Sequence, residues 1–234
     1  MKKKEHSDKP SMPGTCDLCH ATLPKITVTT HLESCVMQQA TSGKQPITAR
    51  SRKTRIFRIL VEGSYQPQYW MHIEIPAALS LLKLDDFLRS TWLECCGHLS
   101  AFKIDGVSYM EEGPEELDTE RMNVSLGRVL SPGMKFDYEY DFGSTTELQL
   151  KVVSEREGEF KGESAKILAR NDPPFIPCDS CGKNNAAVIC TECDSESIGG
   201  WLCDECAKEH ECDEEMRLPV VNSPRTGVCG YDGQ

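Results

Sequence analysis

Cysteine spacing between residues 178 and 229 constrains the fold of this 234-residue chain more than any other feature. Eight of the 13 cysteines lie in this last quarter, and six of them form Cys-x-x-Cys pairs: Cys178/Cys181, Cys190/Cys193 and Cys203/Cys206. His210, Cys212 and Cys229 follow them. Because few apolar residues accompany these side chains, a hydrophobic core cannot hold the segment together. Their chemistry predicts stabilisation by bound zinc.

The beginning of the chain bears on the redox state of these thiols. The first ten residues, MKKKEHSDKP, are basic but precede no apolar stretch, so they do not resemble a secretory signal. No run of 18 apolar residues predicts a membrane span. We therefore expect a cytoplasmic protein with reduced cysteines that act as metal ligands rather than disulfides.

The eight potential ligands from Cys178 to Cys212 suffice for two tetrahedral sites. Alternate use of the pairs resembles the cross-braced B-box, MYND and RING modules, whereas consecutive use is the alternative. The interleaved prediction places Cys178, Cys181, Cys203 and Cys206 in one site and Cys190, Cys193, His210 and Cys212 in the other.

The segment from His210 to Cys212 is the weak point of this arrangement. Only one residue separates the two side chains, so the backbone must bend for both to reach one ion. Cys229 is an alternative fourth ligand, because Gly227 and Gly230 on either side of it permit a tight turn.

Both sites are expected to be structural, because Cys-rich sets of four ligands leave no open position for a substrate. Residues 171–234 contain four Lys/Arg against thirteen Asp/Glu, a net charge of −9. This acidity argues against nucleic-acid binding at this end of the chain and favours a protein partner.

A second Cys/His cluster lies near the N-terminus. Cys16, Cys19, His31 and Cys35 have the spacing of a Cys-Cys-His-Cys zinc finger, with His20 as a less well placed alternative ligand. His31 and Cys35 are four residues apart and would share one face of a helix around 29–35. With the two later sites, the sequence predicts three zinc ions per chain.

The charge of the N-terminal part differs from that of the rest. Residues 1–60 carry eleven Lys/Arg against four acidic residues, a net charge of +7, and the remainder carries −18. A basic arm can contact nucleic acid, although a solvated tail is the simpler interpretation. The predicted finger helix has Thr, Glu and Ser where a major-groove reader would need Arg or Lys.

Residues 55–157 show the alternating pattern of a separate α+β domain. Residues 55–63 and 69–76 form a predicted hairpin, and 81–92 have helical apolar spacing with Ser80 as N-cap. Asp105-Gly106 predicts a second hairpin, residues 124–130 a short helical turn, and residues 134–155 a final hairpin. The first strand is apolar on both faces and is expected to be central in the sheet.

Three passages carry a resemblance to a known family. They are the strand of Trp70 ending in Ile-Pro at 75–76, the helix-to-strand passage LDDFLRSTWLECCGHLSAFKIDGVSY, and LGRVLSPGMKFDYEYDFG. From Phe57 to Val153 the chain resembles the plasmid pRiA-type open-reading-frame-three-like family, which is related to the passenger protein of an insertion element. The resemblance implies a compact α+β fold, β-grasp-like in outline, and no established activity.

Cys95, Cys96 and His98 form a further cluster, for which a metal site or a nucleophile is conceivable. Adjacent cysteines on a regular helix do not easily share one ion. We therefore favour a helix C-terminus, with Gly97 in the left-handed region and one cysteine in the core. No paired carboxylates, Ser-His-Asp set or phosphate-binding loop indicates an enzyme.

The sequence thus predicts an α+β domain flanked by two small zinc modules. The expected segments are a tail (1–14), a zinc finger (15–37), a basic linker (38–54), the central domain (55–157), a linker (158–177) and a double-zinc module (178–234). We expect a non-enzymatic zinc protein that contacts other proteins. The alternative is a nucleic-acid-associated protein linked to mobile elements and acting through residues 1–60. No small-molecule substrate is indicated.

Overall fold

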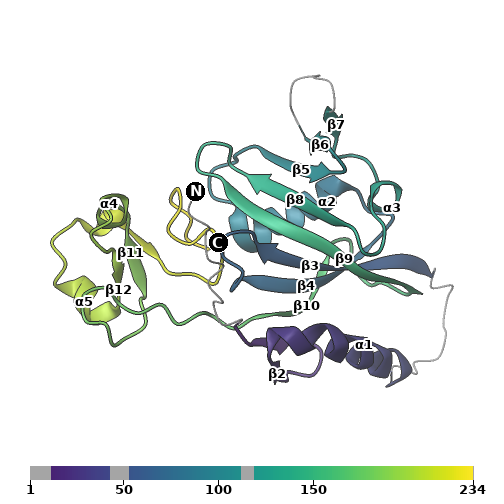
Figure 1. Cartoon of the computed structure of the whole chain (residues 1–234), viewed down its shortest axis with the longest axis horizontal. Helices are drawn as coiled ribbons and strands as arrows, with labels where there is room; N and C mark the ends of the chain where they lie inside the picture. The colour runs from purple at the N-terminus through teal and green to yellow at the C-terminus, as the bar shows by residue number, and fades with distance from the viewer. Residues whose placement is uncertain (1–11, 43–52, 112–118, 234) are drawn as a thin grey trace, which may run out of the picture.

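Two β-sheets organise the chain in the computed structural model, which describes residues 12–42, 53–111 and 119–233. The larger sheet has the strand order β2-β1-β10-β4-β3-β9-β8-β5-β6-β7, and the smaller one the order β12-β11-β13. Figure 1 shows the small sheet at one end of the molecule, away from the large one. The predicted α+β class is confirmed.

The centre of the large sheet is built from long antiparallel strands. β3 (Thr54–Gly63) lies between β4 (Trp70–Pro76) and β9 (Thr146–Gly158), as its apolar pattern predicts. The sheet continues through β8 (Lys135–Tyr140), β5 (Ser100–Ile104), β6 (Val107–Met110) and β7 (Thr119–Arg121). All three predicted hairpins are present, and the pairing of β6 with β7 is parallel.

One face of the sheet packs against the predicted helix. α2 (Leu81–Leu88) begins after Ser80, whose Oγ accepts a hydrogen bond from the Lys83 N–H at 3.4 Å. It continues into a π-helical turn, η1 (Arg89–Leu93), and α3 (Leu126–Val129) is the predicted short turn. Phe57, Ile59 and Val61 point from β3 into the core beneath these helices.

The opposite face of β3 and β4 is also covered, which explains why every residue of β4 is buried. Trp70 packs there against Val28 and Leu32 of α1 (Lys25–Ser42). The finger's two strands, β1 (Gly14–Cys16) and β2 (Thr22–Leu23), extend the edge of the sheet through β10 (Lys166–Asn171). Figure 1 shows α1 running alongside β10.

β10 corrects the expectation of a simple connector at 158–177. Its residues pair with β4 on one side and with β1 on the other. Charged and Pro-rich residues surround this strand, so its sequence resembles a linker. Its apolar residues become buried only because β4 and β1 pair with it on either side. The basic linker expected at 38–54 is shorter at both ends, since α1 reaches Ser42 and β3 begins at Thr54. Residues 43–52 lie outside the described part.

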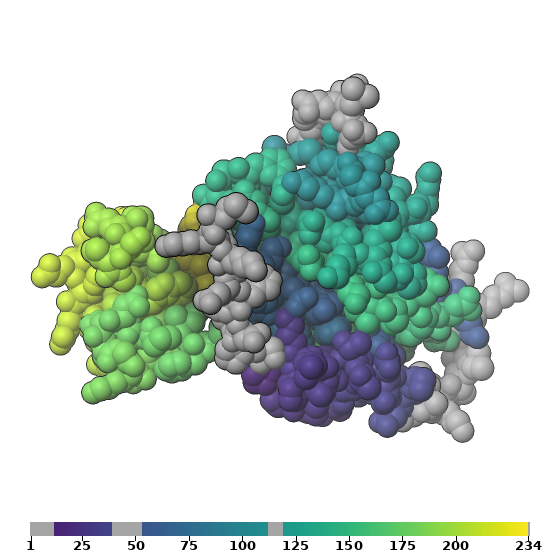
Figure 2. Space-filling model, viewed as in Figure 1, coloured from purple at the N-terminus to yellow at the C-terminus, as the bar shows by residue number. Residues whose placement is uncertain are grey.

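The C-terminal module is made of short elements. They are β11 (Val188–Cys190), α4 (Thr191–Ser195), β12 (Trp201–Leu202), α5 (Asp204–Lys208), the 3-10 turn η2 (Glu214–Met216) and β13 (Arg217–Pro219). The space-filling view shows the module as a lobe beside the body of the molecule (Figure 2). None of the helices in the described part of the chain combines the length and apolarity that crossing a bilayer demands.

The last residues return from the module to the central domain. Ser223 Oγ donates to the Trp92 carbonyl at 2.6 Å, and the buried Arg225 side chain pairs with Asp141 at 2.8 Å. Asn222 exchanges hydrogen bonds with Asn171 at the end of β10. Residues 222–225 therefore belong to the packing of the central domain.

Candidate metal centres

Cysteine and histidine side chains gather into four groups of four. In each group the potential ligand atoms lie within 4.8 Å of one another. The groups are Cys16/Cys19/His31/Cys35, Cys178/Cys181/Cys203/Cys206, Cys190/Cys193/His210/Cys212 and Cys95/Cys96/His98/Cys229. Together they contain all 13 cysteines of the chain. Because no cysteine lies outside these groups, the groups account for the whole cysteine content of the protein.

The distances within the groups match the edges of a zinc tetrahedron. Zn–S and Zn–N bonds of about 2.3 and 2.0 Å imply S–S edges of about 3.8 Å and S–N edges of about 3.5 Å. Cys181 Sγ lies 3.9 Å from Cys203 Sγ, and Cys193 Sγ lies 3.6 Å from Cys212 Sγ. Cys193 Sγ lies 3.5 Å from His210 Nε2, and Cys19 Sγ lies 3.3 Å from His31 Nε2. These four distances thus have the lengths that the edges of a zinc tetrahedron require.

The finger group is assembled by a turn and a helix. The N–H of Cys16 donates to the Ala21 carbonyl at 3.0 Å, which closes the turn that carries Cys16 and Cys19. His31 and Cys35 come from successive turns of α1, as the four-residue spacing predicts. His20 is exposed and lies outside the group, so His31 is the histidine that the fold brings to the cysteines.

The module uses its Cys-x-x-Cys pairs alternately. Cys178 and Cys181 meet Cys203 and Cys206 from the start of α5, which is the interleaved arrangement. The turn after Cys178 places Gly182 at φ 66°, and its N–H donates to the Cys178 carbonyl at 2.8 Å. Consecutive pairing would require contacts between the first and second pairs that this grouping does not contain.

Arg217 provides the bend that the spacing of His210 and Cys212 requires. One nitrogen of its guanidinium group donates to the carbonyls of His210 at 2.9 Å and Cys212 at 2.5 Å. A second nitrogen donates to the Ala207 carbonyl at 2.8 Å. Because three carbonyls converge on one cation, the backbone from 207 to 212 curls and turns both side chains toward Cys190 and Cys193. This role of Arg217 was not predicted from the sequence, because no spacing pattern links Arg217 to His210 and Cys212.

Within each group, an ionised thiol makes ionisation of its neighbours less favourable, so the pKa values of the cysteines differ. Backbone N–H donors from Cys181 and Cys203 lower the pKa of Cys178 to about 6. In the neighbouring group the hydrogen bond with Cys193 raises the pKa of Cys212 to about 12, and burial raises that of Cys35 to about 12 in the finger. Three or four thiols this close cannot all ionise unaided, whereas a divalent cation removes the repulsion.

The fourth group joins two segments more than 130 residues apart. Cys95, Cys96 and His98 follow η1, and Cys229 comes from the returning C-terminal segment. Gly97 has φ 72° and Cys95 packs against the core, as expected for a helix C-terminus. However, that interpretation left out Cys229, whose Sγ lies 3.3 Å from His98 Nε2. Cys229 is therefore grouped with these residues and not with His210.

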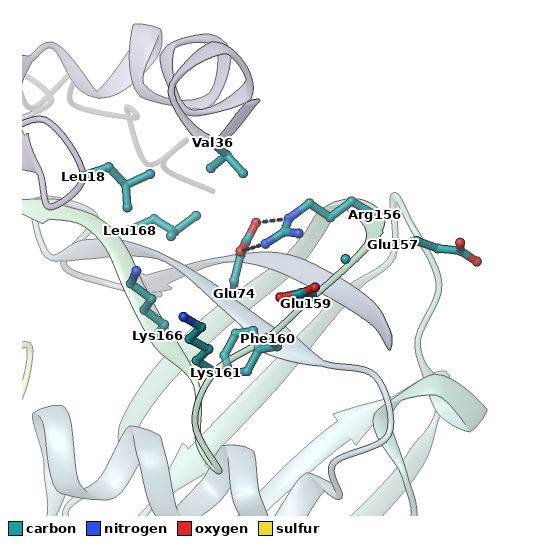
Figure 3. Close-up of a pocket in the computed structure, with 11 residues that line it drawn as sticks. Leu18, Val36, Glu74, Arg156, Glu157, Glu159, Phe160, Lys161, Lys166 and Leu168 are labelled. Carbon is teal, nitrogen blue, oxygen red and sulfur yellow. Dashed lines mark hydrogen bonds and ion pairs between the residues drawn. The ribbon is translucent and has the colours of Figure 1, made fainter. Parts of the chain in front are cut away.

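A pocket of about 550 Å³ opens between the finger and the sheet (Figure 3). Leu18 and Val36 of the finger line one side of it. On the other side, Glu74 pairs with Arg156 through two hydrogen bonds of 2.8 and 2.5 Å. None of the four Cys/His groups lines this pocket.

Comparison with known proteins places the central part of the chain in a family. The chain is similar over 49% of its length to 67% of a protein of unknown function from Methanosarcina mazei Go1, at 16% identity and a TM-score of 0.43. No protein with a curated description matches it. The family model described as "Plasmid pRiA4b ORF-3-like protein" matches residues 54–182, which is more than half of the chain. The chain therefore belongs to the plasmid pRiA4b ORF-3-like family.

Proposed function

We propose that this chain is a non-enzymatic zinc protein in which the finger group and the two interleaved groups are closed structural sites. One observation carries the proposal. The three groups each present four Cys/His ligand atoms, all within 4.8 Å of one another. Four protein ligands complete a tetrahedral zinc ion and leave no position for water or substrate.

The composition of the groups supports zinc over other cations. Thiolate and imidazole ligands suit zinc, whereas magnesium and calcium prefer oxygen. The finger and module have small apolar clusters, so metal binding would contribute much of their folding free energy. The resemblance of the module to B-box, MYND and RING domains supports this role. A β-grasp-like outline of the central domain stays a prediction.

A protein partner is favoured over nucleic acid. Exposed apolar side chains, Ile198 and Phe175 among them, lie within residues 171–234, a segment of net charge −9. On α1, the first finger's helix, Lys25 is the one cationic residue, and it pairs with Glu62. The surface that a DNA-reading finger would present is therefore poor in cations.

Elemental analysis of the purified full-length chain tests the zinc assignment. At least three zinc ions per chain are expected from these three groups. Cys19→Ser, Cys181→Ser and Cys193→Ser should each remove one ion, because each changes a different group. Fewer than three zinc ions in a folded, reduced wild-type chain would contradict the proposal.

Heparin and DNA chromatography at low salt tests the partner class. The proposal expects no salt-dependent retention of the full-length chain. Retention that disappears when the basic residues at 50, 52 and 53 are neutralised would instead support the nucleic-acid alternative.

A further inference from the structure

We propose that Cys95, Cys96, His98 and Cys229 form a fourth zinc site, which fastens the C-terminal segment to the central domain. The four ligand atoms lie within 4.8 Å of one another, as they do in the other three groups. His98 Nε2 lies 3.3 Å from Cys229 Sγ, close to the S–N edge of about 3.5 Å in a zinc tetrahedron. The composition, three cysteines and one histidine, equals that of the finger group.

The backbone removes the main objection to two adjacent cysteine ligands. The helical turn ends at Leu93, and Glu94 is extended at φ −66° and ψ 126°, so Cys95 and Cys96 do not lie on a helix. Gly97, with φ 72°, donates its N–H to Glu94 Oε1 at 2.6 Å and reverses the chain before His98. Both cysteine side chains and the imidazole can therefore converge.

Cys229 is held in place by a comparable turn. Its own φ is 50°, and Gly227 and Gly230 have φ values of 80° and 70°. For a non-glycine residue the left-handed region is unfavourable, so the surrounding packing must stabilise it. The anchor is the hydrogen bond from Ser223 Oγ to the Trp92 carbonyl, which docks the segment one turn before Cys95.

Polar groups around the site are arranged as an outer shell for a metal ion. With Nε2 facing Cys229, the other imidazole nitrogen of His98 lies 3.7 Å from Asp141 Oδ1. A carboxylate behind a histidine fixes the ring orientation in metal sites. Arg225 Nη2 contacts both Asp141 Oδ2 at 2.8 Å and Cys95 Sγ at 3.4 Å. Three thiolates, one neutral imidazole and Zn²⁺ carry a net charge of about −1, and the contact with Cys95 brings the buried Arg225 cation against one of these thiolates.

Exposure distinguishes this site from the others. Cys96 and Cys229 are exposed, whereas each of the other groups contains at least two buried cysteines. Solvent and chelators can reach the ion here more readily than elsewhere. The fourth zinc is therefore expected to leave first, while the other ions stay bound.

Zinc counts on the full-length reduced chain test the inference. The wild type should hold four ions, and Cys96→Ser and Cys229→Ser should each hold three. Cys96→Ser is expected to fold like the wild type, because the Cys96 side chain is exposed and belongs to none of the hydrophobic clusters. Ser64→Ala, at an exposed position in the β3–β4 turn, is the control and should keep four ions.

Zinc release to a chromogenic chelator provides an independent measurement. One zinc ion per wild-type chain should leave in a fast phase, and this phase should be absent from Cys96→Ser. The inference is overturned if wild type and both variants hold equal numbers of zinc ions, whether three or four. Three ions throughout would leave the proposed function of the other groups intact, whereas fewer than three in the wild type would contradict that function.

Discussion

At the scale of single residues, Arg225 connects the C-terminal segment to Cys95 and Asp141, which lie 130 and 84 residues earlier in the chain. Its side chain is fully buried, pairs with Asp141 and lies over the Tyr140 ring at 4.8 Å. It also donates to Thr146 Oγ1 at 3.0 Å. A buried cation with these partners holds the C-terminal segment against the turn between β8 and β9.

Replacing Arg225 by Met should destabilise the protein strongly. Loss of the cation leaves Asp141 with an uncompensated charge, so the free energy of unfolding should fall by about 3–5 kcal/mol. Urea unfolding followed by tryptophan fluorescence measures the change. The control Arg128→Met changes an exposed arginine and should alter the value by less than about 0.5 kcal/mol. Equal midpoints for the two variants would refute this role of Arg225.

His72 should make the fold sensitive to acid. Burial, and then the nearby positive charges of Arg58 and Lys25, lower the pKa of His72 to about 4. The unfolded chain has a histidine pKa of about 6.5, so it binds the proton first as the pH falls. His72 therefore contributes stability above pH 6.5 that is lost between pH 6.5 and 4, by about 3 kcal/mol in total.

Comparing the wild type with His72→Phe separates the contribution of His72 from the stability that both proteins lose when acid releases their metal. Both proteins lose metal-dependent stability at low pH, but the wild type should lose about 3 kcal/mol more between pH 6.5 and 4. Unfolding free energies measured across this range provide the test, with His20→Gln, at an exposed position, as the control. Parallel pH profiles for wild type and His72→Phe would contradict the prediction.

At the scale of elements, the contact of β1 with β10 joins the finger to the sheet. Gly14 pairs with Asn171, and its Cα lies so close to β10 and β4 that an added Cβ would collide with the Arg170 carbonyl and the Trp70 indole. Glycine is required at this position by proximity and not by an unusual backbone angle.

Gly14→Ala should therefore loosen the finger without unfolding the central domain. Overpacking of this kind costs about 1–3 kcal/mol. Hydrogen exchange should become faster in β1 and β10 and stay unchanged in β8. Gly143→Ala is the control, because its added Cβ would meet only Asp141 Oδ1 at 3.4 Å. Unchanged exchange in β1 would show that the finger accommodates the methyl group.

The hairpins and α2 were predictable because their signals are local. Asp105 and Gly106, both at positive φ, form the expected turn between β5 and β6, and Ser80 caps α2. β10 was not predictable because its pairing partners, β4 and β1, lie about 100 residues or more away. A six-residue strand that contains Lys166 and Arg170 acquires an apolar environment only from such partners.

At the scale of the whole molecule, the central domain and the C-terminal module differ in the size of their apolar cores. The central domain has a core of large apolar side chains beneath α2, Trp92 and Phe102 among them. The cluster in the module consists mostly of cysteines, together with Leu202 and Ala207. Without cations, the module has little apolar burial to oppose the entropy of its chain.

Metal removal should therefore unfold the module and spare the central domain. After treatment with a strong chelator under reducing conditions, trypsin should cleave at Lys183, Lys208 and Arg217, while a fragment containing β3 to β9 resists. Mass spectrometry of the digest identifies the sites, and readdition of zinc should restore protection. Simultaneous loss of the β3–β9 fragment would show that the central domain also requires metal.

The sequence by itself determined the family of the central domain, its α+β class and the residues from which three Cys/His groups are built. These features follow from short-range patterns, namely alternation, helical spacing and Cys-x-x-Cys pairs, which need no knowledge of distant contacts. Only the tertiary structure decided that the module's pairs interleave, that Arg217 bends the chain at His210, and that Cys229 lies beside His98. Those outcomes depend on which distant segments pack together, and Cys229 reaches His98 because Ser223 and Arg225 dock its segment on the central domain.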